Sequence, residues 1–208
     1  RKNDGFLNII SIFSFIGISL GVAVLIIVMS VMNGFRTELI NKIVGFNAHA
    51  VVQTYDKPIS TKIFKNNDVL KKNVSKTLFS NDGEAVILNK NKTKGVLLKG
   101  YFHKDFKNFK ILKNGDFIGK KGLEEYDISI GKELSFNLDL KVGDKITIMS
   151  PIGIQTIVGS LPKQETFKIT SIFDSGLAEF NQNIAYINLN TLEDFFDKNK
   201  NDRFTEYY

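Results

Sequence analysis

The sequence of 208 residues contains no cysteine. A disulfide framework, a thiolate nucleophile and a cysteine-based metal site are therefore excluded. The absence is compatible with either side of a membrane, so it does not indicate a compartment. The length is sufficient for one or two domains with a hydrophobic core.

Charged side chains are missing from the whole stretch between Gly5 and Phe35. A helix needs about 20 apolar residues to cross the hydrocarbon core of a bilayer, and this run is longer. No proline interrupts the run or the charged segment that follows it up to Phe46. A buried helix of a soluble protein is usually shorter and shows a polar stripe. The segment is therefore predicted to be a transmembrane helix.

A cleaved signal peptide is the main alternative to a transmembrane helix. Arg1 and Lys2 could form its basic start, and the small residues Ala48 and Ala50 resemble a cleavage site. However, the apolar core of a signal peptide spans about 7–15 residues and ends close to the cleavage site. Here the run is longer, and a charged helical turn separates it from the alanines. We therefore expect an uncleaved span whose amino-terminal end, next to Arg1 and Lys2, is cytoplasmic.

The residues after the apolar run predict an amphipathic continuation of the same helix. Phe35, Leu39, Ile40 and Ile43 recur at helical spacing and form one apolar face. Charged and polar side chains occupy the rest of the segment. We expect a stalk whose apolar face packs against a partner or against the following domain.

Two glycines within the span have the spacing of a helix-packing motif. Gly17 and Gly21 lie four residues apart, and small residues at this spacing allow two membrane helices to approach closely. The pattern is also common by chance, so simple tolerance of glycine in a membrane helix is the alternative.

The chain is basic, with 28 Lys and Arg residues against 22 Asp and Glu residues. An excess of positive charge can indicate nucleic acid or anionic lipid as a partner. The lysines are interleaved with Asn, Asp and Glu, and they do not form a stripe with stacking aromatic residues. We expect a solvated lysine-rich surface and no nucleic-acid partner.

Short β-branched or aromatic runs dominate the chain after Ala48, and turn-forming residues bound them. They predict strands at residues 48–55, 84–89, 95–102, 127–131, 144–149, 166–173 and 183–189. Two helices are expected, one from about Ser60 to Leu78 and one from about Thr191 to Lys198. Asn190 would cap the second helix, with Glu193 completing a capping box.

These elements predict an α+β protein in two parts. Residues 1–46 would form the transmembrane helix and stalk, and residues 47–208 a mixed, strand-rich domain. Within that domain, a strand-rich subdomain at about 84–190 would be inserted in an α/β subdomain.

No arrangement of residues indicates catalysis, a resident metal or a cofactor. His49 and His103 lie far apart, and neither has a partner at helical spacing for a metal site. The sequence from Gly115 to Lys121, GDFIGKK, superficially resembles a phosphate loop. Its spacing is one residue short, and Lys121 stands where a Ser or Thr should bind magnesium. A turn between strands is the better interpretation, and we expect no enzymatic site on this chain.

One segment of the first helix carries a specific resemblance. Residues 17–39, GISLGVAVLIIVMSVMNGFRTEL, are similar to the first membrane helix of the LolC and LolE permease subunits of bacterial lipoprotein-releasing ABC transporters. This family belongs to the larger MacB/FtsX-like superfamily. The match is most specific at Ser30–Phe35, SVMNGF, and the segments Ile130–Pro151 and Phe167–Leu189 agree with the family in the same order.

The resemblance implies a body plan and a set of partners. Family members carry one amino-terminal membrane helix, a periplasmic domain that resembles that of MacB, and three more membrane helices. This chain would cover the first helix and most of the periplasmic domain, in the bacterial inner membrane. ATP and Mg²⁺ would be bound by a separate LolD-like ATPase subunit. The other implied partners are a second permease subunit or a second copy, a LolA-like periplasmic carrier and the lipoprotein cargo.

The resemblance also implies roles for two groups of residues. The stalk face of Phe35, Leu39, Ile40 and Ile43 would line a path for acyl chains or pack against the partner permease. A carrier-docking loop would fall on Pro151 to Pro162. Its implied residues are Pro151, Ile152, Ile154, Ile157, Val158, Pro162 and the flanking Gln164.

This loop departs from the LolC pattern at several positions. Thr156, Ile157 and Val158 stand where the pattern has a proline, and Thr147 and Glu165 stand where it has basic residues. A LolE-like role, a homodimeric permease that performs both tasks, and an ordinary strand connection therefore stay open.

Two alternative functions are also compatible with the sequence. A MacB- or FtsX-type permease would drive efflux or regulate cell-wall hydrolases. A single-span anchored binding or sensor domain would have no role in transport. The SVMNGF segment favours lipoprotein release.

Overall fold

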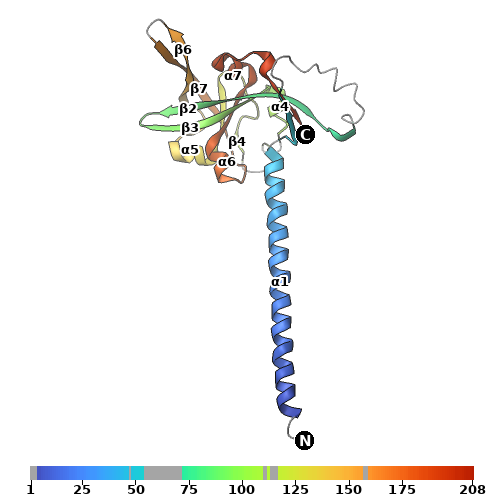
Figure 1. Ribbon diagram of the computed structural model, residues 1–208. Helices are drawn as coiled ribbons and strands as arrows, with labels where there is room; N and C mark the ends of the chain where they lie inside the picture. The colour runs from blue at the N-terminus through green and yellow to red at the C-terminus, as the bar shows by residue number, and fades with distance from the viewer. Residues whose placement is uncertain (1–3, 47, 54–71, 110–111, 113–116, 157–158) are drawn as a thin grey trace. The chain divides into compact units, whose positions relative to one another are not determined.

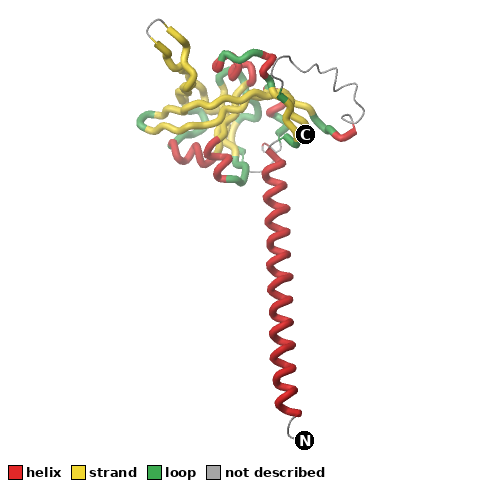
Figure 2. The backbone as a smooth tube through the Cα atoms, in the orientation of Figure 1, coloured by secondary structure: helices red, strands yellow, loops and turns green. Residues whose placement is uncertain are grey.

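The computed structural model describes residues 4–46, 48–53, 72–109, 112, 117–156 and 159–208. The chain divides into two compact units, Arg1–Ile43 and Val44–Tyr208. The first is a single helix and the second is a strand-rich domain (Figures 1 and 2). One apolar helix followed by a mixed, strand-rich sheet is the α+β arrangement that the sequence predicts.

Helix α1 spans Asp4–Phe46 without a break, so the apolar run and the charged segment form one helix. Its 43 residues give a length of about 65 Å at 1.5 Å per residue. The stretch Gly5–Ile40 has a mean hydropathy of 2.8 and is long enough to cross a membrane. Its side chains are exposed within the chain, as expected for a surface that faces lipid or another helix.

The second unit is built on a closed ring of six strands. These are β2 (Thr77–Asn89), β3 (Lys92–Tyr101), β8 (Ile184–Asn188), β5 (Asp127–Gly131), β7 (Gly159–Phe173) and β6 (Lys145–Thr156). Neighbours in this order are hydrogen-bonded, and β6 pairs back onto β2 to close the ring. Two of the pairs, β3 with β8 and β5 with β7, are parallel, and the others are antiparallel.

Three short strands extend the ring at two places. β9 (Phe204–Tyr207) pairs with the start of β2, and β1 (Ala50–Val52) pairs with β9. β4 (Ile118–Gly119) pairs with β7.

The inside of the ring is filled by aliphatic side chains, as small barrels require. Ile87, Leu98, Ile130 and Ile148 are fully buried there, each from a different strand. Burial of one such side chain stabilises the domain by about 1.5–3 kcal/mol. Helices α5 (Lys132–Leu138) and α7 (Leu189–Phe196) contribute further side chains to this core. The packed ring therefore holds in place the parts of β6 and β7 that extend beyond it, and strand β9 at its edge.

A second, aromatic cluster lies on the outer side of the ring. Tyr101, Phe106, Phe173 and Tyr186 are buried there, with Phe106 supplied by the short helix α4 (His103–Phe106). Tyr186 contacts the rings of the other three at centroid distances of 5.2–6.0 Å. The outer face of β3 and β8 is therefore covered at this end.

The two predicted helices of the domain need correction. Residues 54–71, which include most of the expected helix from Ser60, lie outside the described part of the chain. Its expected end is wrong, because Leu78 lies in β2, where it is buried in the aromatic cluster. Strand β2 also begins seven residues earlier than the sequence predicted, since Thr77–Ser80 pair with β9.

The second helix is confirmed in type but begins earlier. The helix α7 starts at Leu189, and the side chain of Asn188, not Asn190, accepts a hydrogen bond from the Asn190 N–H. Glu193 does not cap the helix, because its carboxylate binds Arg203. Helices α4, α5 and α6 (Ala178–Asn183) were not predicted. Strand β1 is shorter than expected, at three residues.

Candidate functional site: a strand arm and a buried carboxylate

Beyond Met149 in β6 and Gln164 in β7, the two strands continue past the ring as a two-stranded hairpin, which we call the arm (Figure 1). The register is regular from Lys145 opposite Lys168 to Met149 opposite Gln164. It then shifts, so that residues 150–152 oppose Lys163 alone, before Gly153 pairs with Pro162. Extra residues on one strand bend and twist a hairpin, which explains why the arm leaves the ring at this point.

The arm coincides with the predicted carrier-docking loop at Pro151 to Pro162. Most of this segment is paired strand, because the pairing continues to Thr156 opposite Gly159. Gly159 has a φ of 126°, a left-handed conformation that favours glycine, so this residue permits the turn.

Several side chains of the arm face solvent, whereas Lys163 reaches back to donate a hydrogen bond to the Asp194 carbonyl. Pro151, Pro162 and Gln164 are exposed, and Leu161 is 62% exposed. Ile152 and Ile154 lie in β6, while Ile157 and Val158 lie outside the described residues. An exposed leucine and two prolines on a projecting hairpin form a surface suited to a partner.

The residues predicted to form the apolar face of the stalk and the glycine packing motif all lie on α1. Phe35 is 62% exposed, and Leu39 and Ile40 are 37% and 45% exposed. Ile43 is in the same helix. A side chain added at Gly17 or Gly21 would meet no described atom within 4 Å. Packing of another helix at these glycines stays a prediction.

A buried carboxylate was missed by the sequence analysis. Glu206 lies in β9 and is 5% exposed. Three hydroxyl groups donate hydrogen bonds to it: Ser80 at 2.5 Å, Tyr101 at 3.0 Å and Tyr208 at 2.8 Å. Ser80 lies in β2 and Tyr101 lies in β3, so residues far apart in the sequence meet at this carboxylate. No local pattern signals such a site, because two of its three donors, Ser80 and Tyr101, are brought to Glu206 only by strand pairing.

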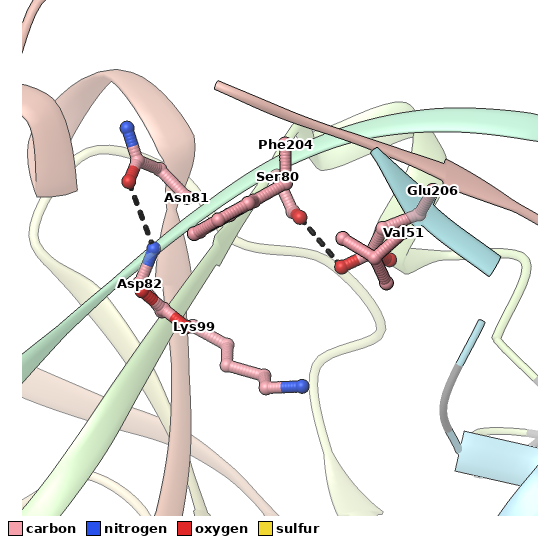
Figure 3. Close-up of a pocket in the computed structure, with 7 residues that line it drawn as sticks. All are labelled: Val51, Ser80, Asn81, Asp82, Lys99, Phe204 and Glu206. Carbon is pink, nitrogen blue, oxygen red and sulfur yellow. Dashed lines mark hydrogen bonds between the residues drawn. The ribbon is translucent and has the colours of Figure 1, made fainter. Parts of the chain in front are cut away.

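A small cavity of about 100 Å³ adjoins this carboxylate. Figure 3 shows Ser80 and Glu206 facing each other across its edge, with Asp82 and Lys99 along the neighbouring strands. Burial and the negative charge of Glu206 raise the pKa of Tyr101 well above its ordinary value. The tyrosine therefore stays protonated and acts as a hydrogen-bond donor, which gives the cluster a structural role.

Metal-binding groups do not gather in the described ranges. No set of three His, Asp or Glu side chains there could hold a metal ion. In the segment that resembles a phosphate loop, Gly115 and Asp116 lie outside the described residues, and the predicted turn is wrong at Ile118–Gly119, which form β4. Lys120 follows β4 and makes an exposed ion pair with Glu124 at 2.7 Å.

Comparison with models of known protein families assigns the chain to a family. Residues 11–206 match the model of the MacB-like periplasmic core domain. The chain belongs to this family. The match covers the described part of the apolar helix from residue 11 and the strand-rich domain, so the predicted membership of the MacB-like superfamily is confirmed over nearly the whole chain.

Several curated relatives of this MacB-like chain are lipoprotein-releasing system transmembrane proteins. LolC of Neisseria meningitidis serogroup B is 28% identical over 200 residues, covering 89% of this chain and 46% of the relative. LolC of Xylella fastidiosa strain Temecula1 is 26% identical, covering 93% and 48%. LolE of Haemophilus influenzae is 29% identical, covering 83% and 43%. The chain thus spans about half the length of these relatives.

Among solved structures, one similarity is to the extracellular domain of the ABC-type transporter YknZ from Gram-positive bacteria. The TM-score is 0.44 at 11% identity, covering 76% of this chain and 82% of that one. The likeness is below the level that establishes a shared fold, so the assignment rests on the sequence family.

Proposed function

We propose that this chain is the first part of a permease subunit of an ABC transporter that releases lipoproteins from the bacterial inner membrane. The observation that carries the proposal is the similarity to LolC and LolE proteins over more than four fifths of the chain. Helix α1 would anchor the subunit, and the strand-rich domain would lie in the periplasm.

The division of labour follows from what such a transporter must do. Each buried methylene group of an acyl chain contributes about 0.8 kcal/mol of membrane affinity, so extraction of several chains needs an external energy source. A separate LolD-like ATPase subunit would supply it by hydrolysing ATP with Mg²⁺. A second permease subunit, or a second copy of this one, would complete the membrane part. The continuous helix α1 would transmit motion between the ATPase side and the domain.

The arm would receive the periplasmic carrier, a LolA-like protein. Support comes from its projection beyond the ring and from the exposed Leu161, Pro151 and Pro162. The base of the arm carries Glu165, which is half-buried opposite Ile148. An acidic residue at this position requires a carrier surface that is not itself acidic there.

Depletion of the full-length protein in its own bacterium tests the proposal. After depletion, the fraction of outer-membrane lipoproteins that remains in the inner membrane is measured by membrane fractionation. We expect this fraction to rise as the protein disappears. Correct sorting of lipoproteins, together with a defect in efflux or cell division, would instead support a MacB- or FtsX-type permease, which the family match also allows.

A further inference from the structure

A groove of about 430 Å³ lies on the β2–β3 pair next to the base of the arm. Its volume is within the range of about 300–1,000 Å³ that is typical of ligand sites. The residues that line it include Glu84, Val86, Gly95, Leu97, Pro151 and Asn183. None of them belongs to the Glu206 cluster, and only Pro151, at the unpaired start of the arm, is shared with the arm.

Strand pairing explains why the groove is there. β6 pairs with β2 only up to Met149 opposite Val86, and then it leaves to form the arm. On the other side, β8 begins to pair with β3 at Ile184 opposite Leu97. Pro151, just after the end of the first pairing, and Asn183, just before the start of the second, therefore flank the two strands.

The floor of the groove is set by alternation along the strands. Ala85 and Val96 belong to the core inside the ring, so their neighbours point outward. Outside, Glu84 pairs with Leu97 and Val86 pairs with Gly95.

Gly95 gives this floor its depth. A side chain added at Gly95 would meet no described atom within 4 Å. A glycine inside a strand often marks a place where a ligand or another backbone approaches closely.

The chemistry of the groove is apolar with one acidic end. Val86 and Leu97 are half-buried, whereas the carboxylate of Glu84 is exposed. In the described part of the chain, the Glu84 backbone pairs with Leu97, and no hydrogen bond or ion pair is made to its side-chain carboxylate. An exposed carboxylate at one end of an apolar groove is complementary to a basic side chain of a bound partner.

We propose that the groove binds an extended peptide segment of a partner protein, with a lysine or arginine two residues from a large aliphatic side chain. Residues two apart in an extended chain lie on the same side, about 7 Å apart, which matches the spacing of Glu84 and Val86. The aliphatic side chain fills the space over Gly95 between Val86 and Leu97, and the basic side chain meets Glu84. This binding goes beyond the proposed release function and does not depend on it.

Peptide binding to the full chain in lipid nanodiscs tests the proposal. The probe is a fluorescein-labelled octapeptide of serine and threonine that carries one lysine and one leucine two residues apart, and its anisotropy is measured. We expect saturable binding by the wild type. Gly95→Trp should weaken it at least tenfold, because the indole fills the groove.

Two further variants separate the groove from general effects. Thr93→Trp places the same side chain two residues away on the same strand, and it should change the affinity by less than twofold. Glu84→Lys should weaken binding at least tenfold and should favour a peptide in which glutamate replaces the lysine. Circular dichroism melting curves establish that each variant is folded.

Three outcomes would overturn the proposal. The first is an absence of binding by the wild type, or binding that Gly95→Trp leaves unchanged. The second is binding of the fluorescent fatty acid cis-parinaric acid, blocked by Gly95→Trp, without binding of the peptide, since the occupant would then be an acyl chain. The third is a wild-type dimer that Gly95→Trp converts to a monomer, since a second copy would then fill the groove.

Discussion

Arg203 holds the carboxylate of Glu193 through two hydrogen bonds, from Nε at 2.5 Å and from Nη2 at 2.7 Å. The side chains are 17% and 6% exposed, so the pair is largely removed from water. The guanidinium also lies over the ring of Phe102, 5.1 Å from its centroid. The pair therefore joins α7 to the entry of β9 and to the end of β3.

Loss of Arg203 should destabilise the domain, because it leaves the Glu193 carboxylate buried without its cation. We expect Arg203→Ala to lower the free energy of unfolding by about 3 kcal/mol. Urea unfolding of the full chain in detergent, followed by circular dichroism, measures this change. The matched control is Glu124→Gln, which removes the exposed ion pair with Lys120 and should have little effect. Equal effects of the two substitutions would contradict the structural role of the buried pair.

The carboxylate of Asp174 should make stability depend on acid pH. Burial raises the pKa of Asp174, but hydrogen bonds from the Gly176 N–H, Lys132 and Asn181 outweigh burial and leave the pKa below its ordinary value. The folded state therefore favours the charged form. This contribution is present above the unfolded pKa of about 3.9 and is lost as pH falls below it.

Asp174→Asn should accordingly lower stability by about 1–2 kcal/mol at neutral pH. The difference from the wild type should shrink as the pH is lowered from 5 to about 3. Unfolding curves at a series of pH values measure it. A difference that stays constant across this range would mean that charge on Asp174 contributes nothing.

Buried tyrosines should make the domain sensitive to alkali. Burial and the Glu206 carboxylate raise the pKa of Tyr101, and burial raises that of Tyr186. The unfolded chain ionises its tyrosines near pH 10, whereas the folded domain keeps these two protonated. Stability should therefore fall as the pH rises above about 10. Ultraviolet titration should show part of the tyrosinate absorbance only when circular dichroism reports unfolding, and a simple titration of all tyrosines before unfolding would refute this.

Close packing at Gly131 should make any side chain there costly. A Cβ at this position would collide with the backbone of Asn181, including its carbonyl oxygen. The carbonyl belongs to α6, whose residue Asn181 is itself fixed by hydrogen bonds to Ser175 and Asp174. We expect Gly131→Ala to lower the midpoint of thermal unfolding by several degrees, as a loss of about 1–3 kcal/mol would. Gly95→Ala is the control and should leave the midpoint nearly unchanged, because its Cβ enters open space.

The arm should contribute to carrier docking without contributing to stability. Leu161 is exposed, so Leu161→Asp removes an apolar contact for a partner while the core stays intact. In the full-length transporter, we expect crosslinking to the carrier to drop at least fivefold with an unchanged melting curve. The matched control is Phe136→Asp, because Phe136 is also an exposed apolar side chain but lies on α5, outside the arm. Unchanged crosslinking in Leu161→Asp would place the docking surface elsewhere.

The elements that were predicted well are those with a strong local pattern. The apolar run of α1 has no charge over about eight turns, and this composition alone specifies a helix that can cross a membrane. Strands such as Asp127–Gly131 were found because their β-branched residues lie between turn-forming residues. Helix α5 was missed because its seven residues follow β5 directly, with no side-chain cap at Gly131.

The positions of the candidate sites could be predicted only in part. The arm was found through the resemblance of its segment to a family, which placed a loop there but did not reveal the long paired strands or the irregularity after Met149. The capping role of Glu193 was wrong because its partner, Arg203, is ten residues away and reaches it only through the fold. Glu206 gave no signal, since two of its three hydrogen-bond donors, Ser80 and Tyr101, are distant in the sequence.

Local sequence patterns were therefore enough to predict a helix long and apolar enough to cross a membrane, its charged continuation, the strand-rich class and the family, because each depends on residues that are neighbours in the chain. The closure of the ring by β6 and β2, the two parallel pairings, the buried carboxylate and the groove over Gly95 became visible only in the folded domain. These features depend on register between strands that are distant in the chain; Ser80 and Glu206, for example, are 126 residues apart. Hydrophobic patterning selects the face of a strand, but the strand beside it is chosen by the packing of the whole core.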